Sequence, residues 1–322
     1  MTAPMIGAAR LRALVGLDEL IEPVSEALQA ASAGRAETGL IVMYPLPDRT
    51  KGDVFVKTGV VDESPVHVVK VAPWFAANAE SGEPQGGFQA VLDSATGRTL
   101  AILDDQHYLS DIRTAAAGAL AARALAPPDA KIAGLLGSGV QAYWQTIALC
   151  RERPMRELLV WARNLANAER LTVRLRKALP GLAIGIANDA ESVVRRSDIL
   201  ITATAAREPI VQGAWLRPGQ HITAVGADDP SKCELDSATL HRARVFVDGT
   251  TETAENGDLY RAIRDGTYLA HAIAGEIGAV LAGTLPGRTS ADDITVAKLV
   301  GIGAQDVAAA TVVVRKLGVL TR

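Results

Sequence analysis

The feature that most constrains this chain is a glycine-rich turn between an apolar run and a helical stretch. The run KIAGLLG leads into GSGVQA (residues 137–142), a GxGxxA pattern, and QAYWQTIALCRER continues it as a helical segment. The first glycine permits a tight bend, the second lets a pyrophosphate approach the main chain, and the small third residue lets helix and strand pack closely. The pattern predicts a nicotinamide dinucleotide site in a Rossmann-type domain that starts near Lys131. The predicted cofactor contacts in this turn are Gly137, Gly139, Val140 and Gln141.

A strand–helix rhythm extends this domain towards the C-terminus. Six apolar runs without polar alternation follow Pro128, namely KIAGLLG, ELLVWA, LAIGIA, DILITAT, HITAVGA and ARVFVDG, and helical stretches separate the first four. Apolar strands that alternate with helices are typical of a parallel sheet covered on both faces. We predict an α/β fold class, with a Rossmann-type parallel sheet over residues 126–303.

The first third of the chain has a different pattern. Residues 1–34 have leucines at helical spacing, and Pro23 is expected to kink or split that helix. The runs LIVMYPL, DVFVKTGVV and VHVVKVA are β-rich, and FQAVLDSATGRTLAILD is typical of a hairpin with the turn SATGR. LSDIRTAAAGALAARALAPP predicts a long helix that ends at Pro127. We expect a smaller α+β domain over residues 1–125, completed by the helical tail 304–322.

Charge and composition exclude several classes of partner. The 322 residues include 33 Lys and Arg against 36 Asp and Glu, so neither nucleic acid nor an anionic membrane is expected to bind. No apolar run is long enough to span a bilayer, and the N-terminus lacks the apolar core of a secretion signal. The two cysteines and five histidines show no metal-ligand spacing. We predict no metal, no disulfide framework and a cytoplasmic location.

The end of the second Rossmann strand indicates which dinucleotide is bound. NAD sites usually carry an acid there, which accepts hydrogen bonds from the ribose hydroxyls. Ala162 stands near that place, and Arg163, which can pair with a 2′-phosphate, follows it. This favours NADP(H) over NAD(H), with Arg163 and Asn164 as contacts. The alternative is an NAD-dependent enzyme in which Arg163 is a solvated loop residue.

The later strand ends supply further cofactor candidates, because ligands in parallel sheets bind outside the carboxyl ends of the strands. Thr202 and Thr204 follow one strand, and Val225 and Gly226 follow the next. For Thr202, an ordinary β-branched residue within a strand is an equally simple interpretation.

The segment GADDPSKCELD contains the candidate acid/base. Asp228 is placed to move protons to and from a substrate nitrogen or carbon. Asp229 is the alternative, and either carboxylate can instead cap the turn before Pro230. Lys232 either contacts the cofactor or substrate, or is a surface lysine.

Three cations in the first domain are candidates for binding a substrate carboxylate. Lys70 lies among apolar residues in HVVKVA, where a lysine is costly to bury unless it meets an anion. Lys57 lies in a strand-like run, where edge protection is the alternative. Arg113 opens the Ala-rich helix and can clamp a carboxylate bidentately, or form an inter-domain salt bridge.

Three linked motifs resemble the ornithine cyclodeaminase/mu-crystallin family. They are RTAAA (residues 113–117), GSGVQA and GADDPSK-x-ELD, in order and over nearly the whole chain. The stretch DVFVKTG…VVKVAPWF is also similar to the cyclodeaminase-like branch of ectoine utilisation. The resemblance implies a homodimer whose first domain binds substrate and builds the dimer sheet. It also implies a dinucleotide that exchanges a hydride with an amino-acid Cα through an imine.

The same resemblance assigns roles to individual residues. Lys70 and Arg113 resemble the substrate-carboxylate binders, and Lys70 and Asp228 are the predicted catalytic residues. Cofactor contacts by resemblance are Gln141, Thr204 and Lys232, and the predicted set is completed by Arg113, Thr114 and Val300.

The sequence also departs from the family pattern. Met43 stands where an arginine is usual, so either one carboxylate ligand is missing or Lys57 replaces it. Gln85, Leu299 and Ala162 stand where a threonine, a serine and an acid are usual. These departures put ornithine in doubt as the substrate. We therefore expect an NAD(P)H-dependent imino-acid reductase or amino-acid dehydrogenase. The alternatives are an ornithine-type cyclodeaminase with tightly bound NAD that releases ammonia, and a non-catalytic NADPH-binding protein like mu-crystallin.

Overall fold

The computed structural model describes residues 3–81 and 85–320, and the chain divides into two units. One comprises Met1–Arg113 with Ile302–Arg322, and the other comprises Thr114–Gly301. The division falls within helix α4 (Tyr108–Leu125), whereas the boundary expected from the sequence lay at the end of that helix. The helix runs through the division without a break, so the sequence shows no change of pattern before Pro127. Within the described ranges, no helix is long and apolar enough to cross a membrane.

The first unit is built on a six-stranded sheet with the order β1-β6-β5-β4-β3-β2. Only β1 pairs in parallel, with β6, and the other neighbours are antiparallel. The predicted hairpin is confirmed, because β5 and β6 pair across the expected turn. The strands are β1 (Met5–Gly7), β2 (Ala36–Met43), β3 (Gly52–Val61), β4 (Val66–Phe75), β5 (Phe88–Asp93) and β6 (Thr99–Asp104). The helices are α1 (Ala8–Leu14), a 3-10 turn at Leu17–Glu19, α2 (Ile21–Ser32), α3 (Ala76–Ser81) and α12 (Gly303–Leu317).

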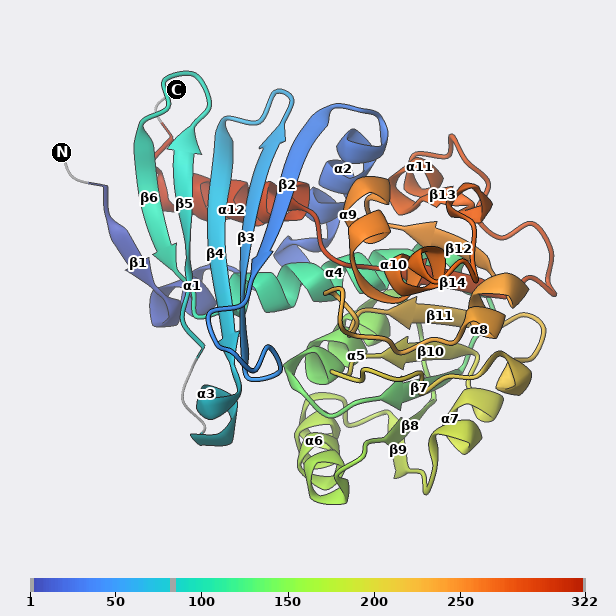
Figure 1. Cartoon of the computed structure of the whole chain (residues 1–322). Coiled ribbons are helices and arrows are strands. Elements are labelled where there is room, and N and C mark those ends of the chain that lie inside the picture. The colour runs from blue at the N-terminus through green and yellow to red at the C-terminus, as the bar shows by residue number, and fades with distance from the viewer. Residues whose placement is uncertain (1–2, 82–84, 321–322) are drawn as a thin grey trace. The chain divides into compact units, whose positions relative to one another are not determined.

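The C-terminal helix α12 covers one face of this sheet, as Figure 1 shows. Strands β3 and β4 alternate between buried and more exposed residues, which is the pattern of a sheet covered on one face. The helix comes very close to β3 at two glycines. A Cβ atom on Gly59 would lie 2.4 Å from the carbonyl oxygen of Gly303. Only glycine permits this approach of helix to strand.

The N-terminal segment differs from the expected long helix. It begins with the short strand β1, and the first helix ends at Leu14, before Gly16. Pro23 does not kink a helix, because it lies in the first turn of α2, where a missing N–H group removes no helical hydrogen bond.

The second unit contains an eight-stranded parallel sheet with the order β13-β12-β14-β11-β10-β7-β8-β9. After β9 the chain returns to the other side of β7, so β7 and β10 flank a topological switch point, where such sheets bind ligands. The strands are β7 (Ile132–Leu136), β8 (Glu157–Trp161), β9 (Ala183–Ile186), β10 (Ile199–Thr202), β11 (His221–Ala224), β12 (Arg244–Val247), β13 (Gly275–Glu276) and β14 (Thr295–Lys298). The helices are α5 (Val140–Glu152), α6 (Leu165–Ala178), α7 (Ala190–Arg196), α8 (Ser237–Arg242), α9 (Thr250–Glu255), α10 (Gly257–Arg264) and α11 (Ile277–Leu281), with 3-10 turns at Gly213–Trp215 and Ala270–Ala272.

Strand β14 was not expected from the sequence. It is only four residues long, yet it lies between β11 and β12 and is fully buried. It ends in Lys298, whose side chain is inaccessible to solvent and forms an ion pair inside the unit. A buried charge at the end of a four-residue run conceals the strand from a hydrophobicity pattern.

Candidate active site

The glycine-rich turn lies between β7 and α5, as the sequence predicted, and its two glycines meet different surroundings. Gly137 has a φ of 129°, and a Cβ there would lie 2.3 Å from the carbonyl oxygen of Ala203. The fold itself therefore requires Gly137. Around Gly139 no heavy atom lies within 4 Å of a Cβ position, so the protein has room for a side chain at this position. A glycine that the fold does not need leaves space for a ligand, as the close approach of a pyrophosphate requires.

The start of α5 fits the phosphates of a dinucleotide. No side chain caps this helix end at Gly139, so its first N–H groups point outward with the positive end of the helix dipole. Val140 is half exposed, and the small Ala142 is fully buried against the sheet. Gln141 accepts a hydrogen bond from Gln145, which also donates to the carbonyl of Thr114. These contacts place the side chain of Gln141 beside the turn.

At the end of β8, the two predicted cofactor residues have different local roles. Arg163 is exposed, and Ala162 precedes it without an acidic group. Asn164 caps helix α6, because its side chain accepts a hydrogen bond from the main-chain N–H of Asn167 at 3.1 Å. The amide of Asn164 therefore has a structural role, and Arg163 is the charged group offered to solvent at this strand end.

Sequence reasoning missed Glu234, which connects the ends of β10 and β11. This buried carboxylate accepts hydrogen bonds from the hydroxyl groups of Thr202 at 2.7 Å and Thr204 at 2.8 Å. It also accepts the main-chain N–H groups of Thr204 and Gly226. The side chain of Thr202 is buried and bonded to Glu234, so it supports the strand end, and its predicted cofactor contact stays a prediction. The position of Glu234 within GADDPSKCELD was the one signal that the sequence offered.

A second buried carboxylate, that of Asp258, binds the main chain at Glu234. Asp258 accepts the main-chain N–H groups of Glu234 and Leu235, and its other oxygen lies 3.0 Å from Nζ of Lys298. This is an ion pair by distance, although the two atoms are not aligned for a hydrogen bond. Burial, with the nearby charge of Asp258, raises the pKa of Glu234, while Lys298 and the threonine hydroxyls oppose the rise. The network holds the two strand ends in a defined position.

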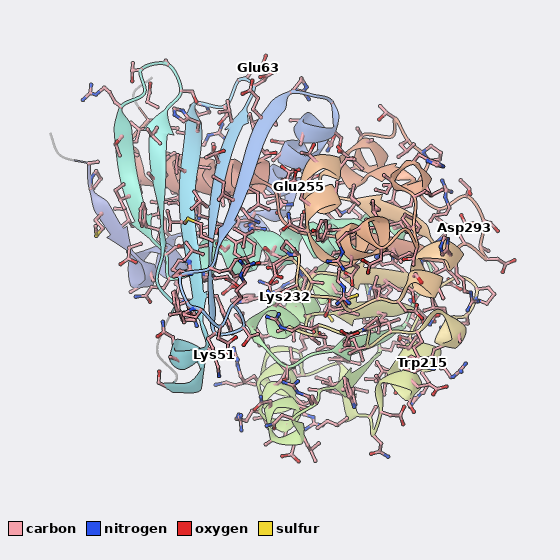
Figure 2. The ribbon with its side chains drawn as sticks, viewed as in Figure 1. Lys51, Glu63, Trp215, Lys232, Glu255 and Asp293 are labelled. Atoms are coloured by element: carbon pink, nitrogen blue, oxygen red, sulfur yellow. The ribbon has the colours of Figure 1, made fainter. Side chains whose placement is uncertain are left out.

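The loop after β11 gives the two candidate aspartates different surroundings. Asp229 is buried and accepts hydrogen bonds from the N–H and hydroxyl groups of Ser231, so it caps the turn. Burial raises the pKa of Asp229, but the charge of Lys232 and these hydrogen bonds lower it by a larger amount. The net shift of this pKa is therefore downward. Asp228 is partly exposed and accepts a hydrogen bond from Nζ of Lys232 at 2.6 Å. Figure 2 labels Lys232, whose positively charged side chain binds Asp228 in this loop. Asp228 is thus the carboxylate of this loop that remains accessible for proton transfer.

Val300, a predicted cofactor contact, follows β14, and its main-chain N–H group is bonded within the protein. Its N–H donates to the buried Asp248 at 3.2 Å, and the N–H of Gly301 donates to the other oxygen of that carboxylate at 2.7 Å. Leu299, which stands where the family has a serine, is buried. Asp248 therefore orients this loop.

In the first unit, the structure brings the predicted substrate-binding cations around one carboxylate that the sequence did not reveal. Asp306, in the first turn of α12, is inaccessible to solvent. Its Oδ1 atom lies 2.9 Å from Nζ of Lys70 and 3.0 Å from Nε of Arg113. Arg113 also donates to Oε1 of Gln305 at 2.9 Å. Along the chain, Asp306 is 236 residues from Lys70 and 193 residues from Arg113, so no local sequence pattern connects them.

The charges in this cluster influence one another strongly. Burial raises the pKa of Asp306, but the charges of Arg113, Lys70 and Lys57 lower it to about 2. Burial lowers the pKa of Lys70, which Asp306 partly restores. The second oxygen of Asp306 has no hydrogen-bond partner among the described residues. Lys70 and Arg113 contact Asp306, Lys57 acts on it through its charge, and the buried Asp105 is a second carboxylate whose charge acts on Lys70. These buried cations are candidates to bind the carboxylate of a substrate.

Two departures from the family pattern are visible in the first unit. Met43 ends β2 and is 45% exposed. Gln85 hydrogen bonds through its side chain to both the N–H and the carbonyl of Phe75. Gln85 therefore extends the pairing at the end of β4. Within the described part of the chain, no group of three or more His, Cys, Asp or Glu residues is placed to hold a metal ion.

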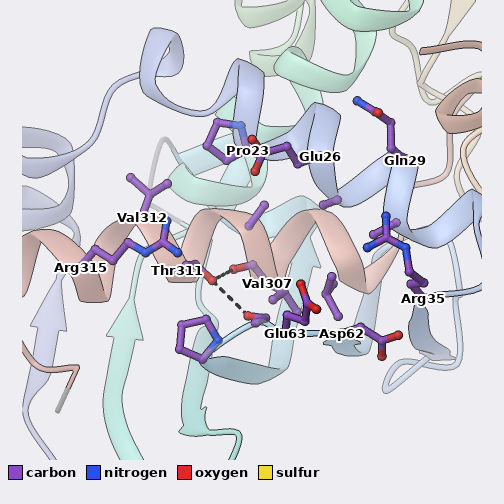
Figure 3. A pocket seen from close by; sticks show the side chains of 16 residues that line it. Pro23, Glu26, Gln29, Arg35, Asp62, Glu63, Val307, Thr311, Val312 and Arg315 are labelled. Atoms are coloured by element: carbon purple, nitrogen blue, oxygen red, sulfur yellow. Dashed lines mark hydrogen bonds between the residues drawn. The ribbon is translucent and has the colours of Figure 1, made fainter. Parts of the chain in front are cut away.

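A separate pocket of about 380 Å³ lies in the first unit between α2, α12 and the turn after β3 (Figure 3). Thr311, at its floor, donates to the carbonyl of Val307 and lies 3.5 Å from the hydroxyl of Ser64. Its charged side chains, among them Glu26, Arg35 and Asp62, are exposed. None of the predicted substrate or cofactor residues lines it.

Comparisons with known proteins agree with these observations. A cyclodeaminase of Sinorhizobium fredii, itself uncharacterised, is 39% identical over 96% of this chain and 94% of its own length. An alanine dehydrogenase of Archaeoglobus fulgidus is 31% identical over 94% of this chain and 91% of its own length. The structure of the Thermococcus litoralis Δ1-pyrroline-2-carboxylate reductase in complex with NADH and L-proline matches with a TM-score of 0.92, at 30% identity, over 99% of both chains. The model of the ornithine cyclodeaminase/mu-crystallin family matches residues 3–318. This chain belongs to the ornithine cyclodeaminase/mu-crystallin family.

Proposed function

We propose that this protein is an NAD(P)-dependent oxidoreductase that interconverts an α-amino acid and the corresponding α-imino acid. The observation that carries the proposal is Gly139, which leaves room for a pyrophosphate at the start of α5 although the fold accepts a side chain there. The reductase and dehydrogenase among its relatives support the same reaction class. In the oxidative direction, an amino acid and NAD(P)⁺ yield an iminium acid, NAD(P)H and one proton.

In this reaction, different residues of the chain bind the substrate and transfer its proton. When bound, the dinucleotide supplies or accepts the hydride at Cα. Lys70 and Arg113 bind the α-carboxylate of the substrate, and Lys57, which pairs with Lys70 in the strand register, belongs to the same substrate site. Asp228 takes a proton from the substrate ammonium in the oxidative direction and returns it in the reductive direction. Lys232, bonded to Asp228, holds that carboxylate in place and contacts the cofactor.

Turnover and net cofactor absorbance test the reaction type. With an imino-acid panel generated from 2-oxo acids and ammonium, NAD(P)H absorbance should fall in step with amino-acid formation. Asp228→Asn should lower kcat by at least 100-fold, because general acid–base catalysis contributes on the order of 10²–10⁴. Unchanged turnover in that variant would contradict the assignment of Asp228.

A cyclodeaminase is the second candidate, favoured by the relative from Sinorhizobium fredii. Such an enzyme reoxidises its cofactor within each turnover, so it releases ammonia with no net absorbance change. Ammonia release from a diamino acid without added cofactor would replace the reductase proposal. A protein that binds NADPH but turns over no amino or imino acid would support the non-catalytic, mu-crystallin-like alternative.

We further propose that NADP(H) is preferred over NAD(H). Arg163 supports this preference, because it is exposed at the strand end where an acid would bind the ribose of NAD. Titration with NADPH and NADH, followed by nicotinamide fluorescence, measures the two affinities. Arg163→Ala should weaken NADPH at least tenfold and leave NADH nearly unchanged, and equal effects on both would remove the role of Arg163.

We also propose that the protein is a homodimer that buries the uncovered face of the six-stranded sheet. The strand register places five exposed apolar residues on the face opposite α12. They are Ile41, Met43, Val60, Val69 and Phe88, each at least 37% exposed. An apolar face of this kind is typical of an interface between copies. Light scattering should give a dimer mass, and Val69→Glu should convert the dimer to a monomer.

The cytoplasmic location stays a prediction of the sequence, to be checked by cell fractionation.

A further inference from the structure

A buried amide beside the cation cluster has no hydrogen-bond partner in the described part of the protein. Gln89, in β5, is inaccessible to solvent, and neither Oε1 nor Nε2 makes a hydrogen bond. Buried polar side chains are nearly always paired, because a desolvated amide without a partner costs free energy. A group of this kind next to a candidate substrate site is therefore a candidate ligand contact.

The strand register places Gln89 in line with the two lysines of the cluster. Gln89 pairs with Lys70 between β5 and β4, and Lys70 pairs with Lys57 between β4 and β3. Residues that pair directly across neighbouring strands point to the same face and lie side by side. The same row continues to Leu40 in β2 and Leu103 in β6. Three polar side chains thus stand between two leucines, on the face that α12 covers.

The chemistry of this row suits a second acidic group. Lys70 and Arg113 share one oxygen of Asp306, and the charge of Lys57 acts on the same carboxylate. An alkyl group packed against Gln89 would leave the amide unpaired in an apolar environment. A carboxylate would accept a hydrogen bond from Nε2, and the positive charge of Lys57 in the same row favours a negatively charged group there. Neighbouring strands are about 4.8 Å apart, so a carboxylate at Gln89 and one at the adjacent Lys70 would be separated by a few carbon atoms.

We propose that Gln89, with the positive charge of Lys57 on the other side of Lys70, favours a side-chain carboxylate next to Lys70, and that the substrate is a short α-amino dicarboxylic acid with its imino acid. This rests on the proposed function, in which Lys70 and Arg113 bind the α-carboxylate. Gln89 is then a specificity-determining residue, because it distinguishes a side-chain carboxylate from an alkyl group of similar size.

Binding of unreactive acids tests this without requiring turnover. Calorimetry of the full chain, saturated with NADP⁺ or NAD⁺, compares succinate with propionate, which lacks the second carboxylate. Succinate should bind at least tenfold more tightly, and Gln89→Leu should remove most of that difference. Equal affinity for both acids, or a difference that persists in Gln89→Leu, would overturn the proposal.

Kinetics separate this inference from the proposed reaction. L-aspartate and L-glutamate should have a higher kcat/KM than L-alanine and L-asparagine, and Gln89→Leu should raise KM for the dicarboxylic acids by tenfold or more. Turnover with L-alanine or L-asparagine preferred would overturn the dicarboxylate assignment alone. Absence of turnover with every amino or imino acid would overturn the proposed function, while the succinate measurement would still decide the role of Gln89.

A matched variant controls for the loss of a buried amide. Gln220 is buried in the second unit and donates to the carbonyls of Val194 and Ser197. Gln220→Leu should lower stability because it leaves these carbonyls unpaired, and it should leave the succinate preference unchanged. If Gln220→Leu reduced that preference as much as Gln89→Leu, the effect at Gln89 would be merely structural.

Discussion

The two units prepare their candidate sites with different groups. In the first unit, buried side-chain charges face one another, with Lys70 and Arg113 on one oxygen of Asp306. In the second unit, the candidate dinucleotide site offers main-chain N–H groups at the uncapped start of α5, and the buried Glu234 accepts N–H groups from the loops after two strands. Burying charged side chains costs free energy, whereas leaving the start of a helix exposed to solvent costs little. Stability and function should therefore be coupled in the first site and separable in the second.

The largest effect is expected from Asp306→Ala in the first unit. Lys70 and Arg113 would lose their shared counter-charge while remaining buried, and breaking a buried pair typically costs about 3–5 kcal/mol. Urea unfolding monitored by circular dichroism measures the change. Asp228→Ala is the control in the second unit, and its loss should stay below about 1 kcal/mol because Asp228 is partly exposed. Equal losses in the two variants would refute the contrast between the units.

Acid should weaken the second unit at a higher pH than the first. Burial, assisted by the charges of Arg288 and Arg153, lowers the pKa of His221 from 6.5 to about 3, so protons favour the unfolded state. Its stabilisation is complete above pH 6.5 and is lost as the pH falls towards 3, by at most about 1.4 kcal/mol per pH unit. The depressed pKa of Asp306 shifts its own loss to between pH 3.8 and about 2.

Hydrogen exchange at pH 7 and pH 4.5 distinguishes these two windows. Amides of β11, around His221, should lose protection at pH 4.5, while those of β4, around Lys70, should keep it. The variant His221→Asn should reduce the pH dependence in β11. Simultaneous loss of protection in both strands would contradict the separate origins of acid sensitivity.

Substitution of the two turn glycines should separate binding from folding in the second unit. Gly139→Ala should leave the unfolding free energy within about 0.5 kcal/mol, because a Cβ meets no atom within 4 Å. It should weaken the dinucleotide at least tenfold, about 1.4 kcal/mol. Gly137→Ala is the matched variant, and it should destabilise the fold because its φ is 129° and its Cβ would clash with Ala203. If the dinucleotide bound Gly139→Ala normally, the pyrophosphate would not lie there.

The smallest effect is expected where charges are exposed. Arg195 and Glu191 form an ion pair at 2.7 Å on the surface of α7, and both side chains are about half exposed. Such pairs one helical turn apart contribute about 0.3–0.5 kcal/mol. Arg195→Ala should therefore change the unfolding free energy by no more than this amount. A loss comparable to that of Asp306→Ala would show that burial does not determine how much an ion pair contributes to stability.

Local patterns predicted most strands of the second unit, but they missed short elements in both units. The runs around β7, β8, β10 and β11 were recognisable because parallel strands buried on both faces are continuously apolar. Strand β14 was missed because it is short and ends in Lys298, and β1 was missed because it has only three residues. Pro23 was misinterpreted because its effect depends on where the helix begins, which a spacing pattern does not reveal.

The sequence by itself determined the glycine-rich turn between a strand and a helix, named Asp228 and Asp229 as candidate acids, and indicated that Lys70 needs an anion, because each depends on a residue and its immediate neighbours. Only the tertiary structure showed that Asp306 meets Lys70 and Arg113, that Glu234 joins two strand ends, and that Gln89 stands beside Lys70 without a partner. The physical reason is that strand register and helix packing bring distant residues together. Coulombic and hydrogen-bond energies depend on that distance in space and not on separation along the chain.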